Sequence, residues 1–177
     1  MNDEFLNALV KRFEGLEREL NLLDAATGDG DHGTTILKGL RAAADAPDAP
    51  AKAFRKAAGG ASGSLFSTLI GALNEVLQGE AELSAALSKS SDRISQLGQA
   101  KPGEKTMLDA LVPASAHQNA QQAANAARAG CKETRAMAAR RGRARYVEGA
   151  GVGHVDAGAT SVAEILDEFA KVTSEDV

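Results

Sequence analysis

The chain has 177 residues, of which 44% are hydrophobic and 25% are charged, as is ordinary for a globular domain with a substantial core. Its net charge of −4 gives no electrostatic reason for binding nucleic acid or membrane surfaces. The single cysteine excludes an internal disulfide, and no apolar run reaches the roughly 18 residues that would span a bilayer. Because the acidic, amphipathic N-terminus is unlike a secretory signal, we expect a cytoplasmic protein.

The first third of the chain predicts helices on either side of an acidic stretch. Apolar residues recur every three or four positions from Leu6 to Leu23, which predicts one amphipathic helix that stops at "DAATGDGDHG". Thr34 or Thr35 can cap a second helix over the apolar residues that follow. The segment "AKAFRKAA", residues 51–58, predicts a short third helix that ends at two glycines.

Helical patterns continue through the rest of the chain. Ser62 or Ser64 can begin a helix, and we expect further helices over residues 82–97 and 104–112. Residues 114–141 are nearly all alanine, glutamine, arginine and lysine, which favours helix, with Gly130 as a break or a close contact. A glycine-rich loop over 142–159 and a last helix over 161–171 follow. The absence of an alternating strand pattern predicts an all-α fold of about eight helices, in one domain over residues 1–177.

The stretch "GDGDHGTT", residues 28–35, holds more polar chemistry than a turn requires. Asp24, Asp29 and Asp31 would repel one another unless a cation lies among them, and hard oxygen ligands favour Mg²⁺ or Ca²⁺. The same loop leads into a helix N-terminus, where free N–H groups and the helix dipole favour a phosphate. This combination indicates a bound nucleotide, while an aspartate-rich turn remains the alternative.

Two further segments carry weaker signals. In "GGASGSLFSTL", residues 59–69, small residues precede the start of another helix, which offers a second site for an anion. The segment lacks the lysine of a Walker loop. "RAMAARRGRAR" is basic, yet in an acidic chain it is more typical of a solvated helix end than of a nucleic-acid site, and one arginine in it could still meet a phosphate. The residues alone therefore predict a helical protein that binds a divalent metal and a phosphate.

Four blocks of this sequence resemble the nucleotide-binding L subunit of dihydroxyacetone kinases (DhaL). They are, in the family's order, "LLDAATGDGDHGTT", "GGASGSLF", "GQAKPGEKTMLDALVPA" and "GRARYVEGAGVGHVDAGATS". The same domain ends the single-chain ATP-dependent kinases. The resemblance implies a closed antiparallel barrel of eight helices, with an ADP or ATP site at one end.

The resemblance also implies which residues form that site. In the family, the aspartates that match Asp24, Asp29 and Asp31 hold two Mg²⁺ ions against the nucleotide phosphates. The positions that match nucleotide contacts or the lid over the nucleotide are His32, Gly33, Thr34, Thr35, Ala61, Ser62, Gly98, Met107, Arg143, Asp156, Ala157 and Gly158. No general base is implied. This chain departs from the family at Ser64 and Ala157, where the family frequently has proline. A proline at position 157 would fix the backbone φ angle of that lid residue.

The implied chemistry is phosphoryl transfer to a small ketose such as dihydroxyacetone, which a separate K subunit holds covalently on a histidine. A phosphotransferase-system protein would rephosphorylate bound ADP in place, or ATP would exchange freely. Alternatives are a subunit or domain of an ATP-dependent kinase for another ketose or tetrulose, and a non-catalytic, nucleotide-dependent regulatory module. A fatty-acid kinase relative is disfavoured, because its loop reads closer to "PDGDTGTN" and this chain has His32 at the Thr. A homodimer is left open.

Overall fold

The computed structural model describes residues 2–174, with the side chain of Arg143 outside the description. Within residues 2–174 the secondary structure is entirely helical, which confirms the all-α prediction. The eight α-helices are α1 (Asn2–Ala25), α2 (His32–Ala44), α3 (Pro50–Ala58), α4 (Gly60–Leu77), α5 (Leu83–Gly98), α6 (Leu108–Ser115), α7 (Ala120–Glu133) and α8 (Ala157–Ser174). Three short 3-10 helices, η1 (Thr134–Ala136), η2 (Arg143–Tyr146) and η3 (Glu148–Gly151), lie between α7 and α8.

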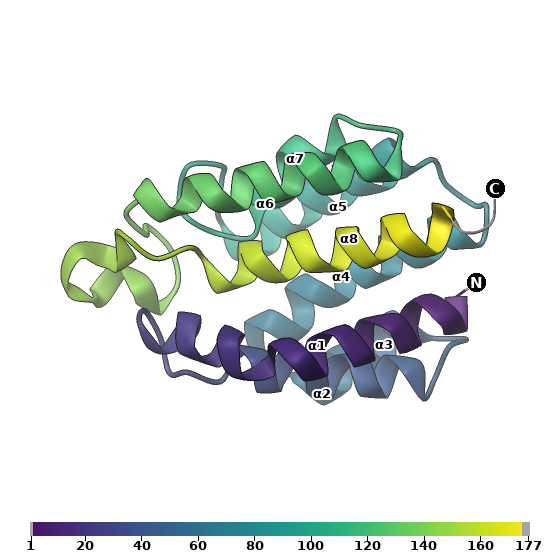
Figure 1. Cartoon of the computed structure of the whole chain (residues 1–177), viewed down its shortest axis with the longest axis horizontal. Coiled ribbons are helices and arrows are strands. Elements are labelled where there is room, and N and C mark those ends of the chain that lie inside the picture. The colour runs from purple at the N-terminus through teal and green to yellow at the C-terminus, as the bar shows by residue number, and fades with distance from the viewer. Residues whose placement is uncertain (1, 175–177) are drawn as a thin grey trace.

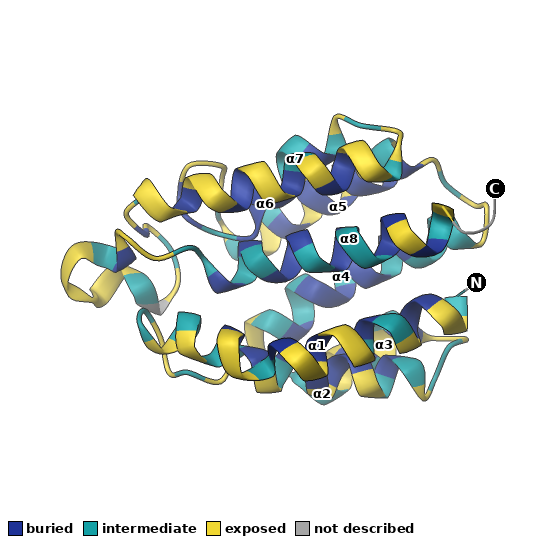
Figure 2. Cartoon of the chain, viewed as in Figure 1, coloured by how far each residue is buried: buried dark blue, intermediate teal, exposed yellow. Residues whose placement is uncertain are grey.

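The helices form a closed antiparallel barrel. Each helix packs against the next one along the chain, and α8 packs against α1, which closes the ring (Figure 1). The apolar stripes of all eight helices meet in one core, built mainly from leucine, alanine and phenylalanine (Figure 2). Phe5 of α1 and Phe169 of α8 meet edge to face, with ring centroids 5.5 Å apart, across the seam that closes the barrel.

The two ends of the barrel differ. The α1–α2 loop and the segment between α7 and α8, residues 134–156, lie at one end, and the termini of the described chain lie at the other (Figure 1). The α2–α3 loop also lies at the far end, since the Asn2 side-chain amide donates to the carbonyl of Pro47 at 2.9 Å. None of the described helices is long and apolar enough to cross a membrane.

Several predicted boundaries in the first half were wrong. Helix α2 begins at His32, with Asp31 at the cap position, so neither Thr34 nor Thr35 caps it. Helix α4 begins at Gly60 rather than at Ser62 or Ser64, because Gly59 has a φ of +67° and turns the chain directly from α3 into α4.

The second half departs further from the predicted elements. The helix expected over 104–112 occupies 108–115, because the side chain of Asp109 accepts hydrogen bonds from the N–H groups of Gly103 and Thr106 and holds a turn there. Within 114–141, where one long helix was favoured, residues 114–115 end α6, residues 120–133 form α7 and residues 134–136 form the short η1. Gly130 is a close contact and not a break: a Cβ there would lie 2.0 Å from the carbonyl oxygen of Asp109 on α6. Beyond Thr134, contacts with residues far away in the sequence replace helical hydrogen bonds.

The remaining predicted helices are present, although the last one begins inside the segment expected to be a glycine-rich loop. The predicted first helix and the helix over 82–97 correspond to α1 and α5, and the last helix starts four residues earlier than expected. Cys131 is buried, and burial raises the pKa of its thiol, in keeping with a structural role. The assignment of residues 1–177 to one domain stays a prediction.

Candidate nucleotide and metal site

The three aspartates of the acidic stretch lie together at one end of the barrel. Asp24 is on the last turn of α1, whereas Asp29 and Asp31 are on the loop that follows. One carboxylate oxygen from each of the three lies within 4.8 Å of the other two. Asp24 also organises the loop, because its Oδ2 accepts hydrogen bonds from the N–H groups of Gly30 at 2.9 Å and Asp31 at 3.1 Å. The loop geometry therefore gathers hard oxygen donors of the kind that Mg²⁺ prefers.

A close contact between α1 and α2 aims the start of α2 at this cluster. A Cβ at Gly33 would lie 2.2 Å from the carbonyl oxygen of Glu17, so only glycine lets the helices approach so closely. Thr34 points away from the cluster: its hydroxyl donates to Glu17 Oε1 at 2.8 Å and accepts from the Asn21 side chain at 2.9 Å. Its N–H also donates to Asn21 Oδ1. Thr34 therefore ties α2 to α1.

His32 forms the floor between the acidic loop and the barrel interior. Its Nε2 lies 2.9 Å from Ser161 Oγ of α8, and its ring meets Phe66 of α4 edge to face at 5.7 Å. Burial lowers the pKa of His32 from 6.5 to about 4, although the nearby Asp24 carboxylate acts in the opposite direction. The imidazole is therefore neutral at pH 7 and held in place by two other helices.

A cleft runs from the acidic cluster into the end of the barrel. Its outer part, of about 310 Å³, lies between the aspartates and the start of α4, at Ala61 and Ser62. Its inner part, of about 320 Å³, is largely apolar and includes Leu65, Gly98 and Met107. Volumes of this size are typical of small-molecule sites, and the polar outer part and apolar inner part match a phosphate chain and a base.

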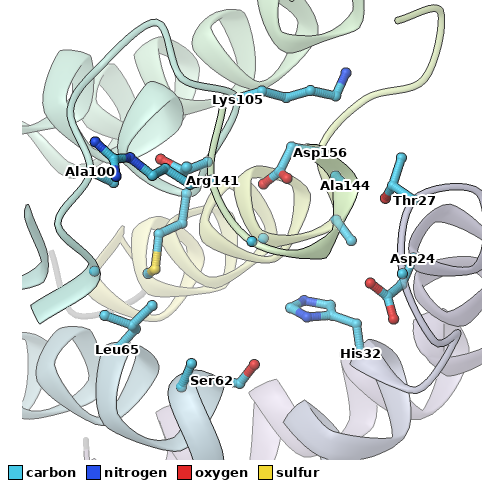
Figure 3. A pocket seen from close by; sticks show the side chains of 18 of the residues that line it. Asp24, Thr27, His32, Ser62, Leu65, Ala100, Lys105, Arg141, Ala144 and Asp156 are labelled. Atoms are coloured by element: carbon cyan, nitrogen blue, oxygen red, sulfur yellow. The ribbon is translucent and has the colours of Figure 1, made fainter. Parts of the chain in front are cut away.

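The remaining wall comes from the segment between α7 and α8 and from the loop before α6. Figure 3 shows Asp24 and His32 on one side of the cleft and Arg141 and Lys105 across it, while Asp156 directs its carboxyl group into the space between. Asp156 also caps α8, since its Oδ2 accepts the N–H of Ala159 at 2.7 Å.

The electrostatics of this wall follow from burial. Burial raises the pKa of Asp156 to about 6, although its bond from the Ala159 N–H and the nearby Lys105 ammonium oppose the shift. Burial likewise lowers the pKa of Lys105, while Asp156 and Asp109 oppose that shift. The Asp156 carboxyl group and the Lys105 ammonium thus partly offset each other, although the ammonium itself points away from the cleft (Figure 3).

Most of the residues expected from the sequence border this cleft. The three aspartates, together with His32, Thr35, Ala61, Ser62, Gly98, Met107, Asp156, Ala157 and Gly158, contribute to its walls. Gly33 and Thr34 do not line it, and the side chain of Arg143 lies outside the described part. The roles of all these residues as ligands stay predictions.

The sequence reasoning missed several residues of the wall. Lys105 and Arg141 line the inner part, as do Thr27 and Ala144. Lys105 stands two positions before Met107 in the third block, and Arg141 directly precedes the fourth block, so their proximity to motif residues was the available signal. Side-chain direction, which spacing in a loop does not give, was the missing information.

Comparison with known proteins agrees with this geometry. The DAK2 domain family matches residues 26–171. The chain is similar to L-erythrulose kinase of Pectobacterium atrosepticum, with 32% identity over 89% of this chain and 32% of that protein. It is similar to triokinase/FMN cyclase of Homo sapiens, with 33% identity over 89% of this chain and 32% of that protein.

A shorter relative matches over nearly its whole length. The ADP-binding subunit DhaL of the PEP-dependent dihydroxyacetone kinase of Escherichia coli is 30% identical, over 86% of this chain and 87% of that subunit. The chain spans about a third of the length of the longer kinases.

A solved structure shares the fold. The dihydroxyacetone kinase of C. freundii, in complex with AMP-PNP and Mg²⁺, superposes with a TM-score of 0.73 at 26% identity, over 96% of this chain and 33% of that one. The eight-helix barrel, the match over residues 26–171 and the likeness to DhaL together show that this chain belongs to the DAK2 domain family, in its DhaL-like branch.

Proposed function

We propose that this chain is the nucleotide-binding unit of a ketose kinase, which binds Mg²⁺ with ADP or ATP in the cleft and supplies a phosphoryl group to a substrate held by a partner. The observation that carries the proposal is the gathering of three carboxylates within 4.8 Å at the mouth of a cleft that borders the starts of α2 and α4. Two relatives with this domain are named for kinase activity on dihydroxyacetone or erythrulose.

The polar part of the cleft suits a polyphosphate. In this proposal Asp24, Asp29 and Asp31 hold two Mg²⁺ ions, which when bound neutralise charge on the phosphate oxygens. The N–H groups at the starts of α2 and α4 favour the same anion. Arg141, which lines the cleft and pairs with Glu104, offers a guanidinium group to the same anion.

The apolar part of the cleft suits a nucleobase. Met107 and Leu65 offer adaptable apolar contacts, and Gly98 leaves room beside them. The neutral His32, held by Ser161 and Phe66, lies where the two parts meet and borders both of them. The cleft therefore orients a nucleotide with its phosphates toward the acidic cluster.

The substrate and the partner complete the proposal. The substrate is a small ketose such as dihydroxyacetone, held by a K-type subunit or domain that docks at the open mouth of the cleft. A phosphotransferase-system protein that rephosphorylates bound ADP, or exchange of free ATP, supplies the phosphate. Tight ADP released when the purified protein is denatured supports the first version, and nucleotide that washes out supports the second.

The experiment is calorimetric titration of ADP into the nucleotide-free protein. It is carried out once in the presence of Mg²⁺ and once in the presence of EDTA. We expect Mg²⁺-dependent binding, and we expect Asp29→Asn to weaken it by more than about tenfold, or about 1.4 kcal/mol, because one anionic ligand is lost. The matched control is Asp48→Asn, an exposed aspartate of the α2–α3 loop at the far end of the barrel. Equal affinities for the two variants would contradict the ligand assignment, and an absence of binding in the unmodified protein would refute the proposed function.

A further inference from the structure

Lys105 is a buried lysine that joins two distant parts of the chain. Its side chain is almost inaccessible, with the whole residue 3% exposed. Its Nζ donates to the carbonyl oxygens of Thr134 at 2.7 Å and of His154 at 2.5 Å. These two carbonyls lie at the opposite ends of the segment between α7 and α8. The ammonium therefore fastens the start of that segment to its end.

The preceding residue, Glu104, holds the same segment at a third point. It is 5% exposed, and its Oε2 accepts from Arg141 Nε at 2.9 Å. Its backbone carbonyl accepts the N–H of Arg140 at 3.1 Å. Because an ion pair with one nearly buried partner depends on its geometry, this contact fixes where Arg141 stands in the cleft wall.

The backbone around Glu104 and Lys105 has an unusual conformation that a neighbouring side chain holds in place. Lys105 has a φ of +60°, a conformation that residues with a side chain rarely adopt. The Asp109 carboxylate holds the turn by accepting from the N–H groups of Gly103 and Thr106. Strain that the surrounding contacts maintain in this way is typical of sites where side-chain direction matters.

The fastened segment also rests on the acidic loop. Gly151 has a φ of +74°, and a Cβ there would lie 2.6 Å from Thr27 Cγ2 and 3.3 Å from Lys105 Cε. The backbone at Gly151 thus passes between the Lys105 stem and the loop that carries Asp29.

We propose that Glu104 and Lys105 are positioning residues that hold residues 134–156 closed over the cleft before a nucleotide binds, so that Arg141 and Asp156 already stand in its wall. The proposal rests on the proposed function only for its effect on nucleotide affinity. The closing of the segment itself is a property of the free protein. Pre-organisation of this kind raises affinity because less conformational freedom is lost on binding.

The test uses Lys105→Met, which keeps most of the apolar stem and removes the donors. The segment carries the exposed residues Arg135, Arg140 and Arg145, so trypsin reports its local opening. In the nucleotide-free protein we expect cleavage within 134–156 to become at least about fivefold faster, while the helical circular dichroism signal is retained. We expect Mg-ADP affinity to fall by at least about tenfold. Lys105→Arg, which keeps charged donors, should restore most of both properties.

Controls separate this effect from a general loss of stability. Lys89→Met removes an exposed lysine of α5 and should change neither measurement. If Lys105→Met does not fold, Gly151→Ala tests the same contact, with Gly149→Ala as its control, because Gly149 has a φ of +71° but a Cβ there meets no atom within 4 Å. Gly151→Ala should then be cleaved faster than Gly149→Ala.

Each outcome bears on the proposal. Unchanged cleavage of folded Lys105→Met, or of Gly151→Ala relative to Gly149→Ala, would overturn the role in holding the segment. Faster cleavage with unchanged Mg-ADP affinity would overturn the role in positioning the site. If the unmodified protein binds no Mg-ADP, the proposed function fails, whereas the cleavage measurement still decides whether Glu104 and Lys105 hold the segment.

Discussion

Asp156 gives the fold a pH dependence that can be measured without any ligand. Its pKa lies at about 6 in the folded protein against an ordinary value of 3.8, because burial disfavours its charged form. A folded pKa above the unfolded one means that the folded state binds the proton more tightly. The stabilisation is therefore complete below about pH 4 and is lost as the pH rises through 6. The charged groups that act on it are Lys105, which favours the carboxylate, and Asp109, which disfavours it.

The magnitude follows from the difference between the two pKa values. About two pH units correspond to about 3 kcal/mol in total, and about half of this is lost between pH 5 and pH 8. Asp156→Asn removes the titration but keeps an acceptor for the Ala159 N–H, since asparagine also caps helices well. The stability of the variant relative to the unmodified protein should therefore increase by about 1.4 kcal/mol from pH 5 to pH 8.

Urea unfolding in EDTA at pH 5, 6, 7 and 8 measures this difference directly. The two proteins share every other titrating group, so those contributions cancel in the comparison. A difference in unfolding free energy that stays constant over this range would refute the reasoning, because it would mean that Asp156 has the same pKa in both states.

Two further predictions concern packing and the placement of one predicted ligand. Phe54 of α3 is fully buried against Gly39 of α2, so Phe54→Ala should lower the unfolding free energy by about 3–5 kcal/mol in urea titrations. The exposed Leu22→Ala is the control and should change it by less than about 0.5 kcal/mol. Thr34→Val removes the hydroxyl that joins Glu17 and Asn21, and should lower the unfolding free energy by about 1 kcal/mol. Its affinity for Mg-ADP should stay within about twofold of that of the unmodified protein, because Thr34 faces α1. A tenfold loss of affinity without loss of stability would show that Thr34 contacts the nucleotide instead.

The sequence by itself predicted what depends on neighbours along the chain. The apolar spacing from Leu6 to Leu23 predicted α1, and a helix that buries one face needs no other information. The spacing of Asp24, Asp29 and Asp31 predicted a cluster, because a short glycine-rich loop leaves its carboxylates few ways to separate. The resemblance of four sequence blocks to the family predicted the helical barrel and a nucleotide site at one end of it.

Only the tertiary structure decided the rest, because it depends on contacts between residues far apart in the sequence. Residues 114–141 favour helix by composition, but the helical conformation stops near Thr134. There the carbonyl of Thr134 accepts a hydrogen bond from Lys105, and the N–H of Arg140 donates to the carbonyl of Glu104. Thr34 faces α1 and Arg141 faces Glu104 for the same kind of reason: a partner from another helix or loop fixes each direction. Local propensities are worth a few tenths of a kcal/mol per residue, so hydrogen bonds made across the barrel outweigh them.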